Sequence, residues 1–170
     1  MLNQKKTKNQ LIDELVELRR RLEELKPLKI EHKRTEESLH ESERKLSTLI
    51  SNLPGVVYRC LNDENWTMEY VSDGCFHLTG FKPPDLIGNR TVAFNDLIHP
   101  TDQQLVWDQI QESLKKKQPY RVVYRIRNAK GEKKWIWDQG VGIPSAEGNI
   151  KVLEGFLIDI TERKRLEAEL

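Results

Sequence analysis

Two cysteines and four histidines are the side chains of this sequence best suited to metal binding or nucleophilic chemistry, and neither set has a catalytic spacing. Cys60 and Cys75 match neither a zinc site nor a Cys-x-x-Cys redox pair. His40-Glu41 has the order of a phosphate-accepting pair, but the Ser42–Lys45 segment that follows does not continue that motif. Gly131–Lys134 is not a phosphate-binding loop, because the required preceding glycine is missing. The sequence therefore predicts no catalytic residue, no metal site and no enzyme activity in this chain.

The charge of the chain is balanced, with 28 basic and 27 acidic residues among 170 and a net charge of +1. A nucleic-acid-binding domain normally carries a clear basic excess, so the composition argues against that class. No apolar run approaches the ~18 residues of a membrane-spanning helix, and the first residues lack the apolar stretch of a secretory signal. We expect a soluble, cytoplasmic protein with no nucleic-acid partner and no membrane span.

Aromatic residues and glycines divide the chain into two regions. All twelve aromatic residues lie between Tyr58 and Phe156, and all nine glycines lie between Gly55 and Gly155. Residues 1–50 contain 12 basic and 10 acidic side chains and no aromatic residue. Such a segment cannot bury enough apolar surface by itself to offset its loss of conformational entropy. It is predicted to be either disordered or a helix whose apolar stripe packs on a partner.

Leucine spacing favours the helix. Leucines recur at alternating intervals of four and three residues, which is the spacing of a coiled-coil seam. A second, weaker series follows, and the two series meet out of step at Pro27. Proline removes a backbone donor, so a break is predicted near Pro27. The predicted dimer seam consists of Leu11, Leu15, Leu18, Leu22, Leu25, Leu39, Leu46 and Leu49.

The seam predicts a parallel homodimer formed through the N-terminal helix of each copy. One alternative is a helical hairpin folded back at Pro27, which no glycine or asparagine turn supports. Another is a lone solvated helix, which is only marginally stable in water.

The rest of the chain has the pattern of a mixed domain. Strands are predicted over residues 56–61, 67–72, 120–127, 134–141 and 150–160. Residues 73–98 contain short apolar clusters interrupted by glycine and proline, which is typical of several short helical turns. Residues 101–117 are predicted to form an amphipathic helix. This order predicts an α+β fold, with a five-stranded antiparallel sheet and helices packed on one of its faces. Trp135 and Trp137 are predicted to share one face of that sheet.

A series of short motifs runs through residues 52–164. They are Asn52–Arg59, Tyr70–Ser72, Leu78–Phe81, Leu97–Asp102, Tyr124–Arg127, Gly131, Trp135-Ile136 and Gly155–Lys164. Their types and order resemble a PAS domain with its C-terminal PAC portion. The resemblance implies a PAS fold at 53–161, after a helical coiled-coil segment at 1–52 and before the start of a signalling helix at 162–170.

The resemblance implies a sensory and signal-relay module of a signal-transduction protein, expected to be part of a sensor histidine kinase. A ligand-linked or dimer-linked change in shape would pass through the flanking helices to a downstream kinase or other output domain. Two alternatives stay open. One is a ligand-free structural dimerisation scaffold, and the other is the input module of a cyclic-di-GMP enzyme.

PAS domains often hold a small molecule between the sheet and the helices, so the resemblance implies a ligand pocket. Thiol–flavin adduct chemistry is excluded, because Gly88–Val92 has no cysteine where LOV-type photoreceptors carry one. Haem needs an axial ligand, and His77 is better explained as a packed or surface residue. No cofactor is therefore assigned. The aromatic candidates for lining a pocket, or for filling the core instead, are Tyr58, Phe76, Phe94, Trp107, Tyr124, Trp135 and Phe156.

The predicted exit from the domain is the Asp159-Ile160-Thr161 segment. Thr161 is predicted to cap a helix that begins at Glu162. Asp159 is close enough in sequence to pair with Arg163, which would couple the end of the last strand to the start of the helix. Asp159, Thr161 and Arg163 are therefore the candidate signal-relay residues.

Overall fold

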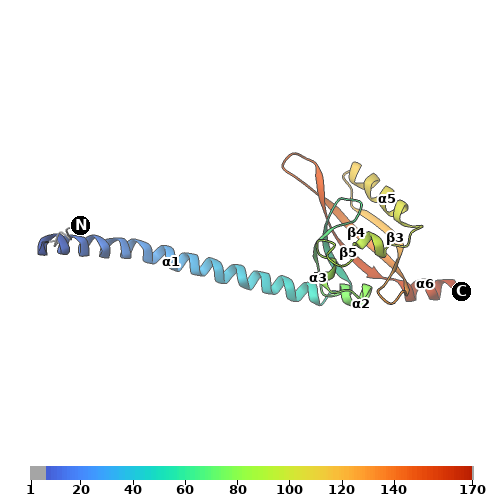
Figure 1. Ribbon diagram of the computed structural model, residues 1–170, viewed down its shortest axis with the longest axis horizontal. Coiled ribbons are helices and arrows are strands. Elements are labelled where there is room, and N and C mark those ends of the chain that lie inside the picture. Colours follow the sequence, from blue (N-terminus) through green and yellow to red (C-terminus); the bar gives the residue numbers. More distant parts are fainter. Residues whose placement is uncertain (1–6, 170) are drawn as a thin grey trace. The chain divides into compact units, whose positions relative to one another are not determined.

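The computed structural model describes residues 7–169 and divides the chain into two units, one ending at Thr48 and the other beginning at Leu49. Helix α1 spans Lys8–Ser51, as predicted for this region (Figure 1). Pro27 lies inside α1 and the helix continues past it, so the break predicted near Pro27 is not an end of the helix. A single proline removes only one backbone hydrogen bond. The helix is therefore regular both before and after Pro27.

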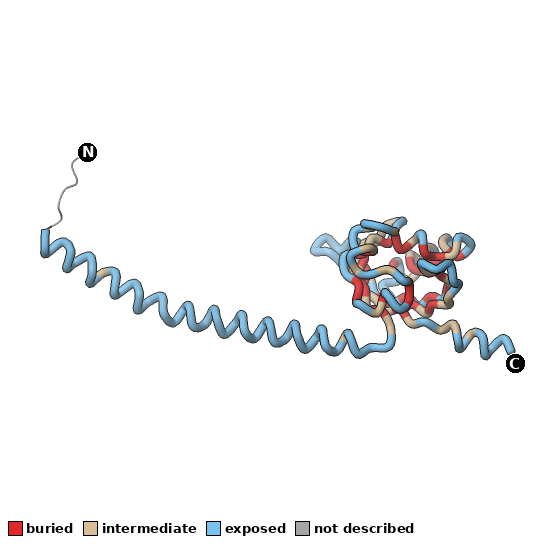
Figure 2. The backbone as a smooth tube through the Cα atoms, turned by 60° about the horizontal axis from the view of Figure 1, so that its bottom comes forward, coloured by how far each residue is buried: buried red, intermediate tan, exposed pale blue. Residues whose placement is uncertain are grey.

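The surface of α1 is open to solvent, and no residue of this helix is buried (Figure 2). The leucines of the predicted seam range from 48% exposed at Leu11 to 65% exposed at Leu49. Opposite charges pair along the helix at intervals of three and four residues, as where Glu17 binds both Arg20 and Arg21. These ion pairs support the helix, while the leucine stripe stays exposed in the single chain. The first six residues of the predicted 1–52 segment lie outside the described residues, as does Leu170 at the other end.

The second unit contains strands and helices in the predicted order. The strands are β1 (Val56–Leu61), β2 (Met68–Val71), β3 (Tyr120–Arg127), β4 (Lys133–Pro144) and β5 (Ile150–Asp159). The helices are α2 (Cys75–Thr79), α3 (Pro83–Leu86), α4 (Phe94–Leu97), α5 (Gln103–Lys115) and α6 (Thr161–Ala168). The short helical turns predicted within residues 73–98 are therefore confirmed as α2, α3 and α4, and the amphipathic helix as α5.

The strands form one sheet in the order β2-β1-β5-β4-β3, in which every neighbouring pair is antiparallel. Strand β5 occupies the centre, because it pairs with β1 on one side and with β4 on the other. The predicted α+β fold with a five-stranded antiparallel sheet is confirmed.

Alternate residues of the strands face the core. In β3 the buried residues are Tyr120, Val122, Tyr124 and Ile126. They pack with the buried side of α5 and with the short helices, and buried residues gather in this layer of the domain (Figure 2). Trp135 and Trp137 share a face as predicted, and it is the outer one, because Ile136 between them is buried.

Candidate functional site

A small cavity lies between the inner face of the sheet and the helices. Its volume is about 10 Å³, which is room for one water molecule. Its lining residues are Tyr58, Cys60, Trp66, Met68, Phe94, Ile98, Val106, Ile110, Tyr124, Asp138 and Leu153. The lining is apolar except for the tyrosine hydroxyls, an indole, a thiol and one carboxyl group, that of Asp138.

The carboxyl group of Asp138 is bound by tyrosine hydroxyls. Tyr58 Oη donates to Asp138 Oδ1 at 2.8 Å, and Tyr124 Oη donates to Asp138 Oδ2 at 3.0 Å. Tyr120 Oη lies 2.6 Å from Tyr58 Oη. Asp138 is 3% exposed, and the three tyrosines are equally inaccessible. We call these four residues the Asp138 cluster. It is a buried polar network within an otherwise apolar core.

Two glycines make room for this cluster. Gly140 of β4 and Gly155 of β5 face each other in register across the two strands. A Cβ atom at Gly140 would lie 2.2 Å from Tyr120 Oη, and one at Gly155 would lie 2.4 Å from Tyr58 Oη. These distances are well inside van der Waals contact, so the tyrosine hydroxyls can occupy their positions only beside residues without a side chain. The two glycines are therefore part of the site.

Burial changes the acidity of the groups around the cavity. It raises the pKa of Asp138 to about 7, because desolvation outweighs the hydrogen bonds from Tyr58 and Tyr124 that favour the charged form. Desolvation also raises the pKa values of Tyr58, Tyr124 and Cys60 well above their usual ranges. The pKa of Cys75 is raised to about 11, again chiefly by burial. Both thiols are free, and neither has the depressed pKa of a reactive cysteine.

The aromatic residues proposed for the pocket separate into two groups. Tyr58, Phe94 and Tyr124 line the cavity. Trp107 packs on the edge of the core, and its ring centroid lies 5.1 Å from that of Trp66. This part of the predicted set lies at or beside the cavity.

Phe76, Trp135 and Phe156 do not line this cavity, which corrects the prediction for these three residues. Phe76 is 48% exposed, because it lies on the outer side of α2. Trp135 and Phe156 lie on the outer face of the sheet, because the alternation along β4 and β5 turns their neighbours Ile136 and Leu157 inward. Residue type identifies large side chains, but the register of the strand decides which face they occupy.

Asp138 and Tyr120 are functional candidates that the sequence reasoning does not find. The feature of the sequence that could identify them is their position in the two-residue period of a strand. Asp138 follows the buried Ile136 by two residues in β4, so the period of the strand turns it inward. Tyr120 has the same phase in β3 as Tyr124. An acidic residue in an inward position of a strand is the feature to look for.

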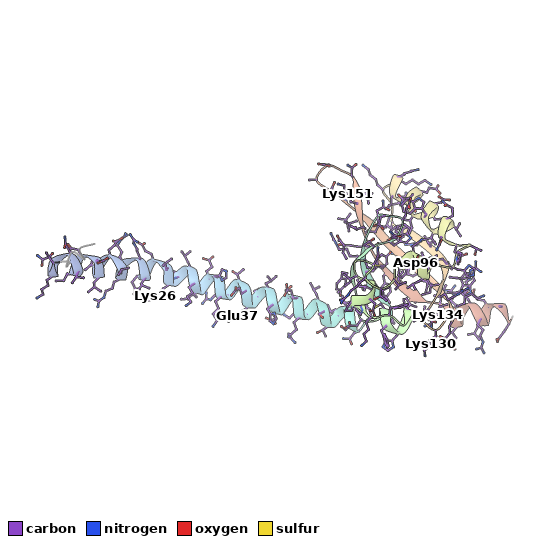
Figure 3. All side chains as sticks on the ribbon, in the orientation of Figure 1. Lys26, Glu37, Asp96, Lys130, Lys134 and Lys151 are labelled. Carbon is purple, nitrogen blue, oxygen red and sulfur yellow. The ribbon has the colours of Figure 1, made fainter. Side chains whose placement is uncertain are left out.

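Thr161 holds the junction between β5 and α6. Its hydroxyl oxygen accepts a hydrogen bond from the Trp135 backbone N–H at 2.9 Å. The Thr161 backbone N–H donates to Asp159 Oδ1, also at 2.9 Å. Lys134, labelled in Figure 3, places its Nζ atom 3.3 Å from Asp159 Oδ2. The start of α6 is therefore attached to both β5 and β4.

Two predicted details of this junction are wrong. Helix α6 begins at Thr161 rather than Glu162, and the hydroxyl of Thr161 binds β4 instead of capping the helix. Arg163 pairs with Glu167 and not with Asp159. The reason is that Glu167 lies four residues along the same helix face as Arg163, while Lys134 of the neighbouring strand pairs with Asp159.

Trp135 lies between two cations on the outer face of the sheet. Arg125 Cζ is 5.5 Å from the centroid of its ring system, and Lys164 Nζ of α6 is 6.0 Å from it. Arg125 also pairs with Asp102, whose pKa is lowered to about 2, chiefly by its hydrogen bond with Arg125. A row of contacts thus runs from the start of α5 across β3 and β4 to α6.

Replacing Thr161 by valine is expected to loosen α6 without unfolding the domain. The change keeps the shape of the side chain, but it leaves the half-buried Trp135 N–H without its acceptor and removes the hydroxyl's hydrogen bond to Asp159 Oδ1. A fully buried unsatisfied donor costs about 1–3 kcal/mol, and this half-buried one costs less. Amide hydrogen exchange in α6 should become faster, while exchange in β3 stays unchanged. Thr161→Ser keeps the hydroxyl and should exchange like the parent. Equal exchange in the valine and serine variants would contradict the role of the hydroxyl.

Within residues 7–169, no helix combines the length and the apolar character needed to cross a membrane. The same residues contain no group of three histidine, cysteine, aspartate or glutamate side chains placed to hold a metal ion.

Residues 68–157, from the start of β2 almost to the end of β5, match the family described as PAS fold. Among characterised proteins, the methyl sulfide methyltransferase-associated sensor of Methanosarcina acetivorans is 27% identical over 128 residues. The matched region covers 75% of this chain and 13% of that protein. The chain spans between 13% and 16% of the length of the curated relatives it matches.

Solved structures share the fold. A sensory box histidine kinase/response regulator from Burkholderia thailandensis superposes with a TM-score of 0.59 at 23% identity, covering 74% of this chain and 91% of that one. The N-terminal domain of a diguanylate cyclase with PAS/PAC sensor from Marinobacter aquaeolei superposes with a TM-score of 0.54 at 19% identity. That match covers 65% of this chain and 98% of that one.

Proposed function

This chain belongs to the PAS-fold family, and we propose that it is a sensory and signal-relay module of a sensor histidine kinase. Its fold is that of a sensory domain and not of a catalytic one. One observation carries the proposal, namely the short connection between the cavity and α6. In the β4–β5 pairing, Asp138 of the cavity wall is opposite Leu157, and Ile136 is opposite Asp159. The cavity wall at Asp138 and Leu157 is thus two residues away, along each strand of this pair, from Ile136 and Asp159, where α6 is attached.

The relay works through the geometry of a helix. A change in the packing of the Asp138 cluster would shift β4 against β5, and Asp159 and Thr161 would pass that shift to α6. To move such an equilibrium from 1:99 to 99:1, the input must favour one state by ~5.5 kcal/mol. The row of contacts through Trp135 gives α6 a second attachment on the outer face of the sheet.

The same proposal includes a parallel homodimer joined through α1, whose exposed leucines have coiled-coil spacing. It also includes a downstream kinase or other output domain, to which α6 would lead. We place the module in the cytoplasm, where its two free cysteines stay reduced.

A fusion to a dimeric histidine kinase core tests the relay. The full chain is joined to the kinase so that α6 continues as one helix, and alanines are then inserted one at a time after Ala168. Kinase activity is expected to change with each insertion and to return after about seven residues, the repeat of a coiled coil. Inserting flexible glycines at the same place should remove this dependence. Kinase activity that changes with neither the alanine insertions nor the glycine insertions would contradict the relay.

Two other functions remain to be compared with this one. A ligand-free dimerisation scaffold is favoured by the small volume of the cavity. It predicts that the activity of the fusion does not depend on the number of residues inserted after α6, which sets the phase of this helix relative to the kinase. The input module of a cyclic-di-GMP enzyme is suggested by the fold shared with the diguanylate cyclase domain. It predicts phase-dependent control in a diguanylate cyclase fusion and none in the kinase fusion.

A further inference from the structure

Asp138 is a buried acid without a cationic partner. Among the described residues it forms no ion pair, and its hydrogen bonds come from the neutral hydroxyls of Tyr58 and Tyr124. Asp102, the other buried acid, differs in this respect because it pairs with Arg125. A buried charge without a partner is strongly disfavoured unless hydrogen bonds or a bound ligand compensate for it.

The hydroxyl protons of the cluster have a definite direction. Each tyrosine has one proton to donate. Tyr58 and Tyr124 donate theirs to Asp138, so the short contact between Tyr58 and Tyr120 must use the proton of Tyr120. The protons of Tyr120 and Tyr58 therefore point toward Asp138 Oδ1 one after the other, and the proton of Tyr124 points directly at Asp138 Oδ2. This arrangement suits an ionised Asp138, which only accepts hydrogen bonds.

We propose that the Asp138 cluster is a proton-binding site, and that the proton is the ligand that this sensory module reads. This inference rests on the function proposed above. The size of the cavity points to the smallest ligand, because about 10 Å³ admits no molecule larger than one water. The cluster is also closed to bulk solvent, since Asp138 is 3% exposed.

Protonation must rearrange the cluster. A hydronium ion of the solvent gives up the proton, so one of its O–H bonds breaks as an O–H bond forms on one oxygen of Asp138, and the carboxylate is neutralised. The new O–H needs an acceptor, and the hydroxyl oxygens of Tyr58 and Tyr124 are already at hydrogen-bond distance. The tyrosine that accepts must turn its own proton away. Tyr58 can turn its proton toward Tyr120 once Tyr120 turns its own proton away from Tyr58, and Tyr124 can turn its proton into the cavity that it lines, which has room for one water.

Within residues 7–169, the other titratable groups that face Asp138 are one thiol and three tyrosine hydroxyls, all of which burial keeps neutral near pH 7. Strand β1 presents Tyr58 and Cys60, strand β3 presents Tyr120 and Tyr124, and burial raises the pKa of all four. The side of α5 that lines the cavity is apolar, and so is the part of α4 that does so. The pKa of Asp138, raised to about 7, places its titration in the physiological range.

The effect on stability has a definite sign. Asp138 has an ordinary pKa of 3.8 when unfolded and one of about 7 in the folded protein, so the folded state holds the proton more tightly. This group therefore stabilises the fold fully at low pH, and its contribution is lost as pH rises toward about 7. Asp138→Asn should remove that part of the pH dependence.

Carbon-13 NMR of the full-length protein, labelled at the aspartate carboxyl carbons, tests the site. The Asp138 resonance, assigned by its loss in Asp138→Asn, is expected to titrate with a midpoint near pH 7. Tyr124→Phe removes a hydrogen bond to the charged form and should raise the midpoint. Tyr120→Phe leaves both hydrogen bonds to Asp138 in place and should shift it less. Amide resonances of α6 should change with the same midpoint in the parent protein and not in Asp138→Asn.

Two results would overturn the inference. They are an Asp138 resonance that does not titrate across the neutral range, and an Asp138 titration that leaves the amide resonances of α6 unchanged. None of these readouts depends on the kinase fusion. If the fusion ignores the phase of α6 while Asp138 still titrates, the relay fails and the proton site stands.

Discussion

If the chain forms the proposed homodimer, replacing Leu18 and Leu22 by lysine is expected to convert it into a monomer. Both leucines lie on the exposed stripe of α1, at 51% and 58% exposure. In a parallel dimer the double variant removes four leucine side chains from the seam, each worth about 1.5–3 kcal/mol on burial, and brings four positive charges together. Sedimentation equilibrium of the parent and the variant, over a range of concentrations, measures the change in association.

Val16→Lys is the matched control for this experiment. Val16 belongs to the same turns of α1 and is 63% exposed, but it lies outside the leucine seam. The control makes the same kind of change without touching the predicted interface, so it should leave the dimer intact. Removing residues 1–45 should weaken association as the double variant does. Dimers of equal strength in all of these proteins would contradict a seam in α1.

Replacing Gly140 by alanine is expected to destabilise the domain by about 1–3 kcal/mol, the usual effect of overpacking a core. The new methyl group would lie 2.2 Å from Tyr120 Oη and 2.7 Å from the Glu154 carbonyl oxygen. The carbonyl belongs to the paired strand and cannot move alone, so the tyrosine must leave its place in the cluster. Thermal unfolding of the full chain should show the loss as a lower Tm for the globular unit.

Gly142→Ala is the control, two residues further along the same strand. Its Cβ atom would meet the Cγ2 methyl of Ile150 at 2.6 Å and the Cδ2 methyl of Leu114 at 2.7 Å. Neither atom belongs to the backbone and Ile150 is only half-buried, so we expect a smaller loss of stability than at Gly140. A larger loss at Gly142 than at Gly140 would contradict the view that the glycine pair is there to accommodate tyrosine hydroxyls.

Much of the fold can be predicted from the sequence because local periodicity carries it. The two-residue alternation of β3 from Tyr120 to Ile126 gives both the strand and its buried face. Glycines and prolines mark the interruptions between α2, α3 and α4. The leucine spacing of α1 identifies a helix despite Pro27, since one missing hydrogen bond does not end a long element.

The candidate site is less predictable, because it is made by residues distant in the sequence. Tyr58 and Asp138 are 80 positions apart and meet only after β1, β5 and β4 have paired. Size and apolarity select Trp135 as a pocket residue, but the register of β4 places it outside. Asp159 and Arg163 are close in sequence, yet Lys134 from another strand is the partner that the sheet provides.

The proline within α1 has a consequence for how a twist travels along the chain. On its N-terminal side the leucine stripe follows one phase and on its C-terminal side another, and the residue where the phases meet has no backbone N–H to donate. One backbone hydrogen bond fewer therefore resists twisting at this step. A rotation applied at either end of α1 would be partly absorbed there, so in the proposed coiled coil the two lengths of helix would wind semi-independently.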